Sequence, residues 1–487
     1  MKPNKDSTRA PVIQQALSKG FSRREFLRNL FFTAGAVGAA QWLTACGLGN
    51  GERVTGGPPH TFSGGSFANL GPLGPPDANG VRTPPGFSTR VVAINSELPF
   101  SEGMNAIAGG NGQPVGGRPW HILNDGGGVI PRDNGGWIYV SNSEVPGLEN
   151  SAALDRNFED AAATFLSLEQ LLLNGALPLP LTTGLGGVGV LVFDPDGSIV
   201  DSYSILTGTT FNCAGSITPW GTWLSCEETL DGLVYECDPF ARNSEGIARP
   251  VLGLFEHEAT FVDTFNRVIY GTEDHPEGRF YRFVPDASDW PQGAARPALN
   301  SGSLQAMVVE GGGVEAALNA PQPVRWKDVI NPDQRQFENR DPEATAFDGG
   351  EGVWIFENIA YFSTKNDNRI WAYDTIAETI EVIYDLATAE PPNDYLSGVD
   401  NITVTNRGDV LVAEDGGDMM VVAILPDRSL RPLLQIVDQD ASEVAGIAFN
   451  PAGDRMYFTS DRGGRNGIGG YGLGAGMLYE LIFPAPV

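Results

Sequence analysis

The chain has 487 residues, of which 62 are glycine and 35 are proline, while only 19% are charged. This composition is typical of a turn-rich β protein and excludes a helical bundle, and barrels and propellers reach this length as a single domain. The formal net charge of −29 argues against binding to nucleic acid or to anionic lipid headgroups, which such a surface repels. It is compatible with carboxylates that hold metal cations, although a solvated acidic surface accounts for most of the charge.

The N-terminal segment reads as an export signal. Ser22–Arg28 contains a twin-arginine pattern, and the apolar run that follows from Leu30 to Ala45 is short and rich in alanine and glycine. Such a run is typical of a signal peptide rather than a membrane span. We therefore expect residues 1–45 to be a twin-arginine signal; the alternative is a chance arginine pair before an ordinary secretion signal.

A lipobox-like sequence, Leu43-Thr-Ala-Cys46-Gly, ends the apolar run. Cleavage before Cys46 would leave an acylated thiol and a membrane anchor, whereas ordinary cleavage nearby would leave this cysteine incidental. Residues 46–85 are rich in glycine, proline and asparagine, which predicts a flexible tether. The remaining residues, 86–487, are then the folded domain.

One pattern recurs along this domain: a turn, several strand-forming residues, a small hydroxyl residue, and an acidic or amide residue. Its six copies are at 136–144, 221–228, 267–274, 360–367, 408–415 and 454–461. Asp415 and Asp461 are 46 positions apart, as are Glu228 and Asp274, which is close to the length of one four-stranded propeller blade. Further strands are expected at 188–193, 278–284, 369–373, 401–404, 446–449 and 477–482.

The sequence thus predicts an all-β fold, a β-propeller with six blades or, as the alternative, seven. Insertions are expected as a helix at Asn157–Asn174 and a loop-rich excursion over 286–345. Because the innermost strand of each blade points its end at the central channel, acids at equivalent places in successive blades would converge there. A strand-end acid can instead merely cap a turn, but the repetition favours convergence of Glu144, Glu228, Glu273, Asp274, Glu414 and Asp415.

The segment Phe211–Glu228 combines the thiol of Cys213 with two adjacent carboxylates. Thiolate sulfur and carboxylate oxygen together suit a metal such as iron, with calcium nearby; the alternative is an inert buried thiol. Cys226 and Cys237 could pair as a disulfide, which would leave Cys213 unpaired.

Other acidic segments add candidate oxygen donors. Phe255–Ala259 and Gly271–His275 offer carboxylates and two histidines, of which we assign only the carboxylates to metal binding. Asp400, Asn401, Glu351 and Glu443 are further candidates. The two G-x-G-x-x-G matches, at 184–189 and 467–472, lack the following helix that a dinucleotide site needs.

The core Cys213-Ala-Gly…Trp-Gly-Thr-Trp223…Cys226-Glu-Glu228 resembles the PhoX family of secreted alkaline phosphatases, with support from Asn142-Ser-Glu144, His257-Glu258 and Thr272-Glu-Asp274. The resemblance implies a propeller whose channel mouth holds Fe3+ and Ca2+ and hydrolyses phosphate monoesters. It assigns Cys213 as the iron thiolate, Glu228, Glu258 and Glu273 as bridging carboxylates, and Asp274, Glu351 and Glu414 as further ligands. Glu144, Asp400 and Asp415 complete the expected metal ligands.

One position departs from the family pattern. The family tends to carry an arginine two residues before the glutamate aligned with Glu351, where this chain has Gly349. Arg462, Arg282 or Arg465 could supply the missing cation, and we take Arg462 and Arg282 as the expected catalytic residues.

The sequence therefore predicts a monomeric, metal-dependent phosphatase of the periplasm or cell envelope, acting on a small phosphorylated substrate. Two alternatives stay open. One is a calcium-dependent, lactonase-like hydrolase that needs no thiolate; the other is a non-catalytic envelope propeller with structural calcium.

Overall fold

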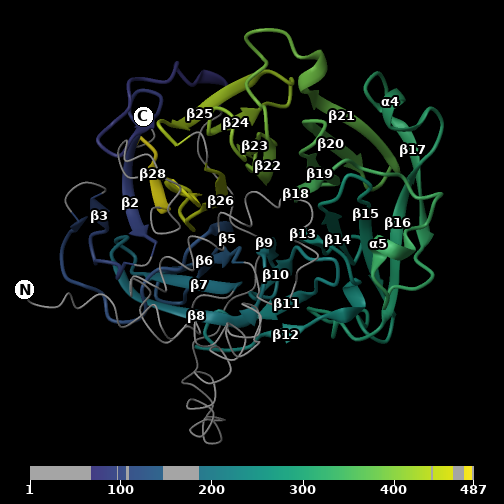
Figure 1. Ribbon diagram of the computed structural model, residues 1–487, viewed down its shortest axis with the longest axis horizontal. Coiled ribbons are helices and arrows are strands. Elements are labelled where there is room, and N and C mark those ends of the chain that lie inside the picture. The colour runs from purple at the N-terminus through teal and green to yellow at the C-terminus, as the bar shows by residue number, and fades with distance from the viewer. Residues whose placement is uncertain are drawn as a thin grey trace, which may run out of the picture.

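The computed structural model describes residues 67–95, 97–105, 109–145, 186–439, 442–463 and 476–484. The expected signal peptide, the lipobox and the helix at Asn157–Asn174 lie outside these residues. Nearly all the regular structure is β-strand, arranged in a ring of blades around a centre (Figure 1). Among the described residues, no helix has the length and apolar character needed to cross a membrane.

The first three blades are antiparallel units that each begin with their innermost strand. Blade one contains β5 (Asn124–Pro131), β6 (Trp137–Ser143), β7 (Gly186–Phe193) and β8 (Ile199–Thr209). Blade two contains β9 (Asn212–Ile217), β10 (Trp223–Glu227), β11 (Val234–Cys237) and β12 (Ile247–Ala248). Blade three contains β13 (His257–Asp263), β14 (Val268–Glu273), β15 (Phe280–Pro285), β16 (Gly302–Val309) and β17 (Gln322–Asp328).

The next three units complete the ring. Blade four contains β18 (Gly350–Phe356), β19 (Ile359–Thr364), β20 (Arg369–Asp374) and β21 (Thr379–Asp385). Blade five contains β22 (Val399–Val404), β23 (Val410–Glu414), β24 (Met420–Ile424), β25 (Leu430–Ile436) and β1 (Val81–Arg82). Blade six contains β26 (Val444–Phe449), β27 (Arg455–Ser460), β28 (Met477–Ile482), β2 (Ser88–Ile94), β3 (Met104–Asn105) and β4 (Gly109–Gly110).

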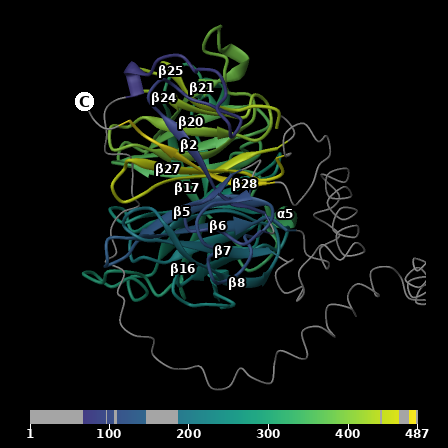
Figure 2. The ribbon, with the colours of Figure 1, turned by 90° about the vertical axis from the view of Figure 1, so that its left-hand side faces the viewer.

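The innermost strands β5, β9, β13, β18, β22 and β26 each contact the next, and β26 contacts β5 again, so six of them surround the channel within the described residues. The ring is closed by the two ends of the chain: β2 pairs with β28 from Ser88↔Ile482 to Ile94↔Met477. Figures 1 and 2 show these two strands side by side. The predicted all-β propeller is confirmed.

Hydrophobic side chains fill the spaces between neighbouring blades. Phe280 of blade three stacks on Phe362 of blade four, with ring centroids 4.3 Å apart. Between blades one and six, Tyr139 contacts Tyr457 at 5.2 Å. Inner strands such as β6 and β22 are buried along their whole length between other blades and read as nearly continuous runs of buried residues, whereas outer strands such as β12 and β17 are largely exposed.

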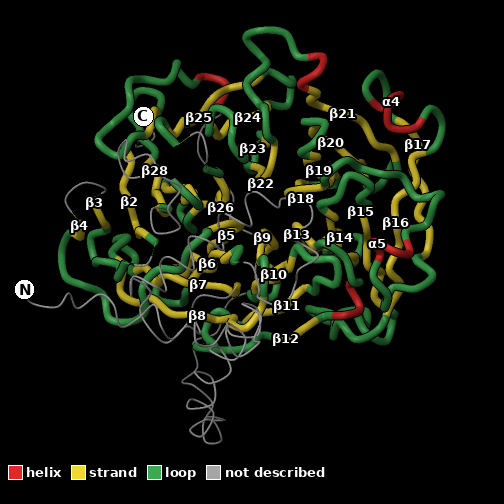
Figure 3. Tube along the Cα trace, viewed as in Figure 1, coloured by secondary structure: helices red, strands yellow, loops and turns green. Residues whose placement is uncertain are grey.

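The expectation of a loop-rich excursion over 286–345 is wrong for much of that segment. It contains β16 and β17 and two short helices, α4 (Gly313–Ala317) and α5 (Gln336–Asn339). β17 pairs with β16 and also with β21, so it joins blades three and four into one nine-stranded sheet. Figure 3 shows both helices outside the inner ring of strands. Within the described part of the chain, three 3-10 helices complete the regular structure: η3 (Phe67–Asn69), η6 (Pro250–Leu252) and η7 (Leu386–Thr388).

The prediction of a flexible tether over 46–85 is wrong for residues 67–85, the part that the structure describes. Phe67 is only 2% exposed and packs with blades five and six, and Val81 pairs with Ile436. The reason is apolar burial: glycine and proline set the turns of this segment, while its few apolar side chains insert into the core. The folded domain therefore begins before residue 86.

Replacing Phe67 with alanine should lower the free energy of unfolding by about 3 kcal/mol, because a buried aromatic side chain is lost and a cavity remains. The matched control is Phe265→Ala, at a position that is 76% exposed, where little change is expected. Urea unfolding of both variants measures the difference. Equal stabilities would mean that residues around Phe67 do not belong to the fold.

Candidate metal centre

The innermost strands share an irregularity at their first residues. In β5 the register shifts between Asn124 and Gly127, and equivalent shifts follow the first residues of β9, β13, β18 and β22. Such a bulge inserts one extra residue and re-aims its side chain. The residues just after the first pair are Asp125, Cys213, Glu258, Glu351 and Asp400. In β26 the shift comes one residue later, and Ala445 stands at the corresponding place.

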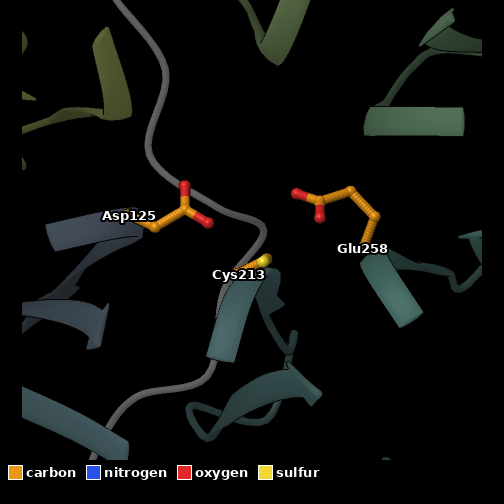
Figure 4. Close-up of side chains that lie close together, drawn as sticks. All are labelled: Asp125, Cys213 and Glu258. Carbon is orange, nitrogen blue, oxygen red and sulfur yellow. The ribbon is translucent and has the colours of Figure 1, made fainter. Parts of the chain in front are cut away.

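These donors meet others at the channel in four groups, each with ligand atoms within 4.8 Å of one another. The groups are Asp125/Cys213/Glu258, Glu144/Cys213/Glu228, Glu144/Glu443/Asp461 and Glu258/Glu351/Asp400. Because Glu144, Cys213 and Glu258 each belong to two groups, the four form one continuous chain of donors. Figure 4 shows Asp125, Cys213 and Glu258 pointing toward one another from three blades.

The repeated sequence pattern lies on the second strand of each blade, namely β6, β10, β14, β19, β23 and β27, not on the innermost strand as expected. Its acids still converge, because the end of the second strand pairs with the start of the innermost one, as in Asn124↔Ser143. The residues that follow these strand ends are Glu144, Glu228, Asp274, Lys365, Asp415 and Asp461.

Two expected ligands have other partners. Glu414 accepts backbone N–H bonds from Ser397 at 2.7 Å and Met420 at 2.9 Å. Glu273 accepts bonds from Arg279 N at 2.9 Å and Arg340 Nε at 3.0 Å. Neither carboxylate belongs to the four groups. In the pairs Glu273-Asp274 and Glu414-Asp415, the first acid therefore forms hydrogen bonds with a nearby loop and the second lies toward the channel.

The structure brings six of the ten expected ligands into the groups: Cys213, Glu144, Glu228, Glu258, Glu351 and Asp400. Asp274 and Asp415 lie beside them, and both are ion-paired with Lys365, at 3.8 and 3.5 Å. Among the expected cations, Arg462 Nη2 lies 3.2 Å from Glu443. Arg282 lies away from the site: it donates a hydrogen bond to Gln305 and lies over the ring of Trp326. Arg465 lies outside the described residues.

Sequence reasoning missed Asp125, Asp461 and Lys365 and named Glu443 as a candidate donor without including it among the expected ligands. Asp125 stands in Asn124-Asp-Gly-Gly, which reads as a turn, and only alignment with the Cys213 and Glu258 positions would have revealed it. Lys365 is the residue that takes an acid's place in the fourth copy of the repeat. The histidines stand apart from the groups: His257 contacts the Gly253 carbonyl, and burial lowers its pKa to about 3.

Burial and mutual repulsion disfavour negative charge at this site. Burial raises the pKa of Glu144 to about 7 and that of Glu228 to about 8. Burial, followed by repulsion from Glu351, raises the pKa of Glu258 well above its usual range. The thiol of Cys213, also buried, donates to Glu228 at 3.0 Å, and burial raises its pKa as well.

This donor set fits metal cations. Asp125 Oδ1 is buried and accepts no hydrogen bond within the described chain. A buried carboxylate is stable as an anion only when it is paired or coordinates a metal. One thiol among several carboxylates combines a soft donor with hard ones. All three cysteines that the structure describes are free thiols, so Cys226 and Cys237 do not form a disulfide.

Gly349 has a φ of +74°, which favours glycine. An added Cβ would lie 2.9 Å from Asn366 Nδ2 and 3.2 Å from Asp274 Oδ1. An arginine at this position would therefore be strained.

The ring of blades, with a thiol and carboxylates gathered at one channel mouth, defines a β-propeller with a candidate metal centre. Residues 196–380 match the family model described as alkaline phosphatase PhoX. This match supports the resemblance to the PhoX family that the sequence motifs indicate.

Comparison with solved structures supports the fold. Pseudomonas fluorescens PhoX in complex with vanadate, a transition state analogue, is 15% identical, with a TM-score of 0.57 over 85% of this chain and 97% of that one. A luciferin-regenerating enzyme is 12% identical, with a TM-score of 0.38 over 75% and 92% of the two chains. A nidogen/laminin complex gives 9% identity and a TM-score of 0.37 over 57% and 82%. Only the first score exceeds 0.5. No curated protein matches this chain in sequence.

The different surroundings of Glu414 and Glu258 give a test of which acids bind metal. Glu414→Gln should lower stability by about 1–3 kcal/mol, since an amide cannot accept both backbone N–H bonds, while bound metal stays unchanged. Glu258→Gln, its matched counterpart, should lose metal. Elemental analysis and thermal unfolding measure both effects. Loss of metal from the Glu414 variant would contradict the placement.

Proposed function

We propose that this protein is a metal-dependent phosphatase that hydrolyses phosphate monoesters at the cell envelope. The match of residues 196–380 to a family model of alkaline phosphatases supports the phosphatase class. The observation that carries the proposal is the unbroken chain of four donor groups, two of which share the Cys213 thiol. A calcium-dependent lactonase-like site needs no thiol, so the central place of Cys213 favours the phosphatase.

The chemistry of the donors assigns different metals to different groups. The two groups that contain Cys213 suit iron, because thiolate is the softer ligand, whereas the all-carboxylate groups suit calcium. Glu144 and Glu258 each belong to one thiol-containing group and to one all-carboxylate group. Such shared membership is what is expected of carboxylates that bridge two metals. When bound, such metals would supply Lewis-acid chemistry that polarises the phosphoryl oxygens.

Arg462 is the cation that the described residues offer in place of an arginine at position 349. Its guanidinium lies 3.2 Å from Glu443 and 3.7 Å from Asp415, and 26% of its side chain is exposed. A guanidinium there can bind and orient the charged phosphoryl oxygens of a small substrate. We assign it that role rather than metal binding.

The N-terminal sequence completes the proposal. PhoX proteins are generally exported, and we propose that this one leaves the cytoplasm folded by the twin-arginine route. In this proposal it works as a monomer, with Cys46 as a lipid anchor.

Elemental analysis of the protein exported by its own signal, with aryl phosphate hydrolysis assayed on the same sample, tests the function. Iron and calcium together with turnover are expected, and a chelator should abolish the turnover. Calcium without iron, or fully metal-loaded protein without turnover, would refute the phosphatase.

Cys213→Ser separates the phosphatase from the calcium-dependent alternative. This variant should lose iron and at least tenfold in activity, because a serine hydroxyl is a poor replacement for a thiolate ligand. Cys237→Ser is the control, since Cys237 is equally buried but lies on β11, outside the four groups. Full activity of Cys213→Ser would favour the lactonase-like hydrolase.

A further inference from the structure

Lys365 is an exception among the residues that follow the second strands. The other five blades place Glu144, Glu228, Asp274, Asp415 and Asp461 at this position. The Lys365 ammonium lies 2.8 Å from Glu351 of its own blade, and 3.8 and 3.5 Å from Asp274 and Asp415 of the two adjacent blades. With 32% of its side chain exposed, it is also open to the channel mouth.

Asp415 lies between two cations that come from different blades. Its Oδ2 is 3.5 Å from Nζ of Lys365 in blade four. Its Oδ1 is 3.7 Å from Nη2 of Arg462, which lies just after β27 in blade six. One carboxylate thus occupies, with both oxygens, the position between an ammonium and a guanidinium. Lysine and arginine side chains bind phosphate groups as well as carboxylates, so two cations placed in this way could also bind a phosphoryl group.

The Asp415 carboxylate is loosely held there. Both ion pairs are longer than hydrogen bonds, and no side-chain hydrogen bond to Asp415 exists within the described residues. The carboxylate is 30% exposed, whereas Glu351 and Asp461, the closer partners of the two cations, are 1% exposed. An incoming anion can therefore displace Asp415 without breaking buried contacts.

The two cations and the thiol-containing groups come from different blades. All members of the two thiol-containing groups come from blades one to three. Lys365 and Arg462 come from blades four and six, where they contact Glu351 and Glu443 of the all-carboxylate groups. With cations bound to the donor groups, an anion between Lys365 and Arg462 would lie near both the metals and the two cationic side chains.

We propose that Lys365 and Arg462 form the anion-binding site for the substrate's phosphoryl group, and that Asp415 occupies it until substrate or phosphate displaces it. This proposal rests on the proposed function, and makes Asp415 an internal competitor rather than a metal ligand. Lys365 then provides, from the next strand, the positive charge that the backbone at Gly349 does not allow.

Calorimetric titration of the metal-loaded protein with inorganic phosphate tests this arrangement. Asp415→Asn should bind phosphate roughly tenfold more tightly, because the competing charge is gone, and Lys365→Met roughly tenfold more weakly. KM for an aryl phosphate should move in the same two directions. The matched controls are Asp427→Asn, in an exposed turn, and Lys327→Met, paired with Asp341 away from the channel; both should bind phosphate as the unmodified protein does.

Elemental analysis of each variant distinguishes the outcomes. Loss of metal with weaker phosphate binding in Asp415→Asn would overturn the proposal, since Asp415 would then be a ligand. Unchanged phosphate affinity in both variants, or no phosphate binding by the unmodified protein, would also overturn it, even if esters are hydrolysed. Phosphate binding that responds as expected, without ester hydrolysis, would instead refute only the phosphatase activity.

Discussion

The repulsion among buried carboxylates at the channel mouth is the constraint on which the rest of this structure depends. Four of these carboxylates are at most 4% exposed and come from four different blades: Asp125, Glu258, Glu351 and Asp400. Ionised carboxylates so close together and so far from water are strongly unfavourable unless cations neutralise them. The propeller nevertheless holds them in place, because each is attached to the start of a strand buried between two blades. The scaffold thus gives up stability to hold a set of carboxylates that a bound cation would stabilise.

Two structural devices make this convergence possible. A bulge at the start of each innermost strand turns one side chain inward, and the paired end of the second strand adds the next residue. The two adjacent acids at the end of the second strand have different roles. Glu227, Glu273 and Glu414 satisfy backbone N–H groups or arginines, and this fixes the loops from which Glu228, Asp274 and Asp415 reach the channel. Purely structural carboxylates therefore position the candidate ligands.

The sequence was sufficient to predict the propeller and most of the donors, because both repeat with the blade. It could not show which of two neighbouring acids faces the channel, since alternation along a strand says only that Glu273 and Asp274 point to opposite sides. Asp125 was overlooked because its surroundings resemble an ordinary turn. Arg282 was misplaced because a strand sequence does not tell how far from the axis the strand lies. β17 was missed since most of its side chains are partly exposed, so it lacks the apolar pattern of an inner strand.

Closure of the ring couples the site to the ends of the chain. Blade six is completed only when β2, near the N-terminus, pairs with β28, near the C-terminus, and Glu443 and Asp461 reach Glu144 of blade one across that junction. A cation held by these three carboxylates would therefore join the last blade to the first. Since metal binding to a site absent from the unfolded chain adds its free energy to folding, such a cation would stabilise the closed ring. Carboxylates that repel one another across the junction would then become, through the cation, contacts that hold it.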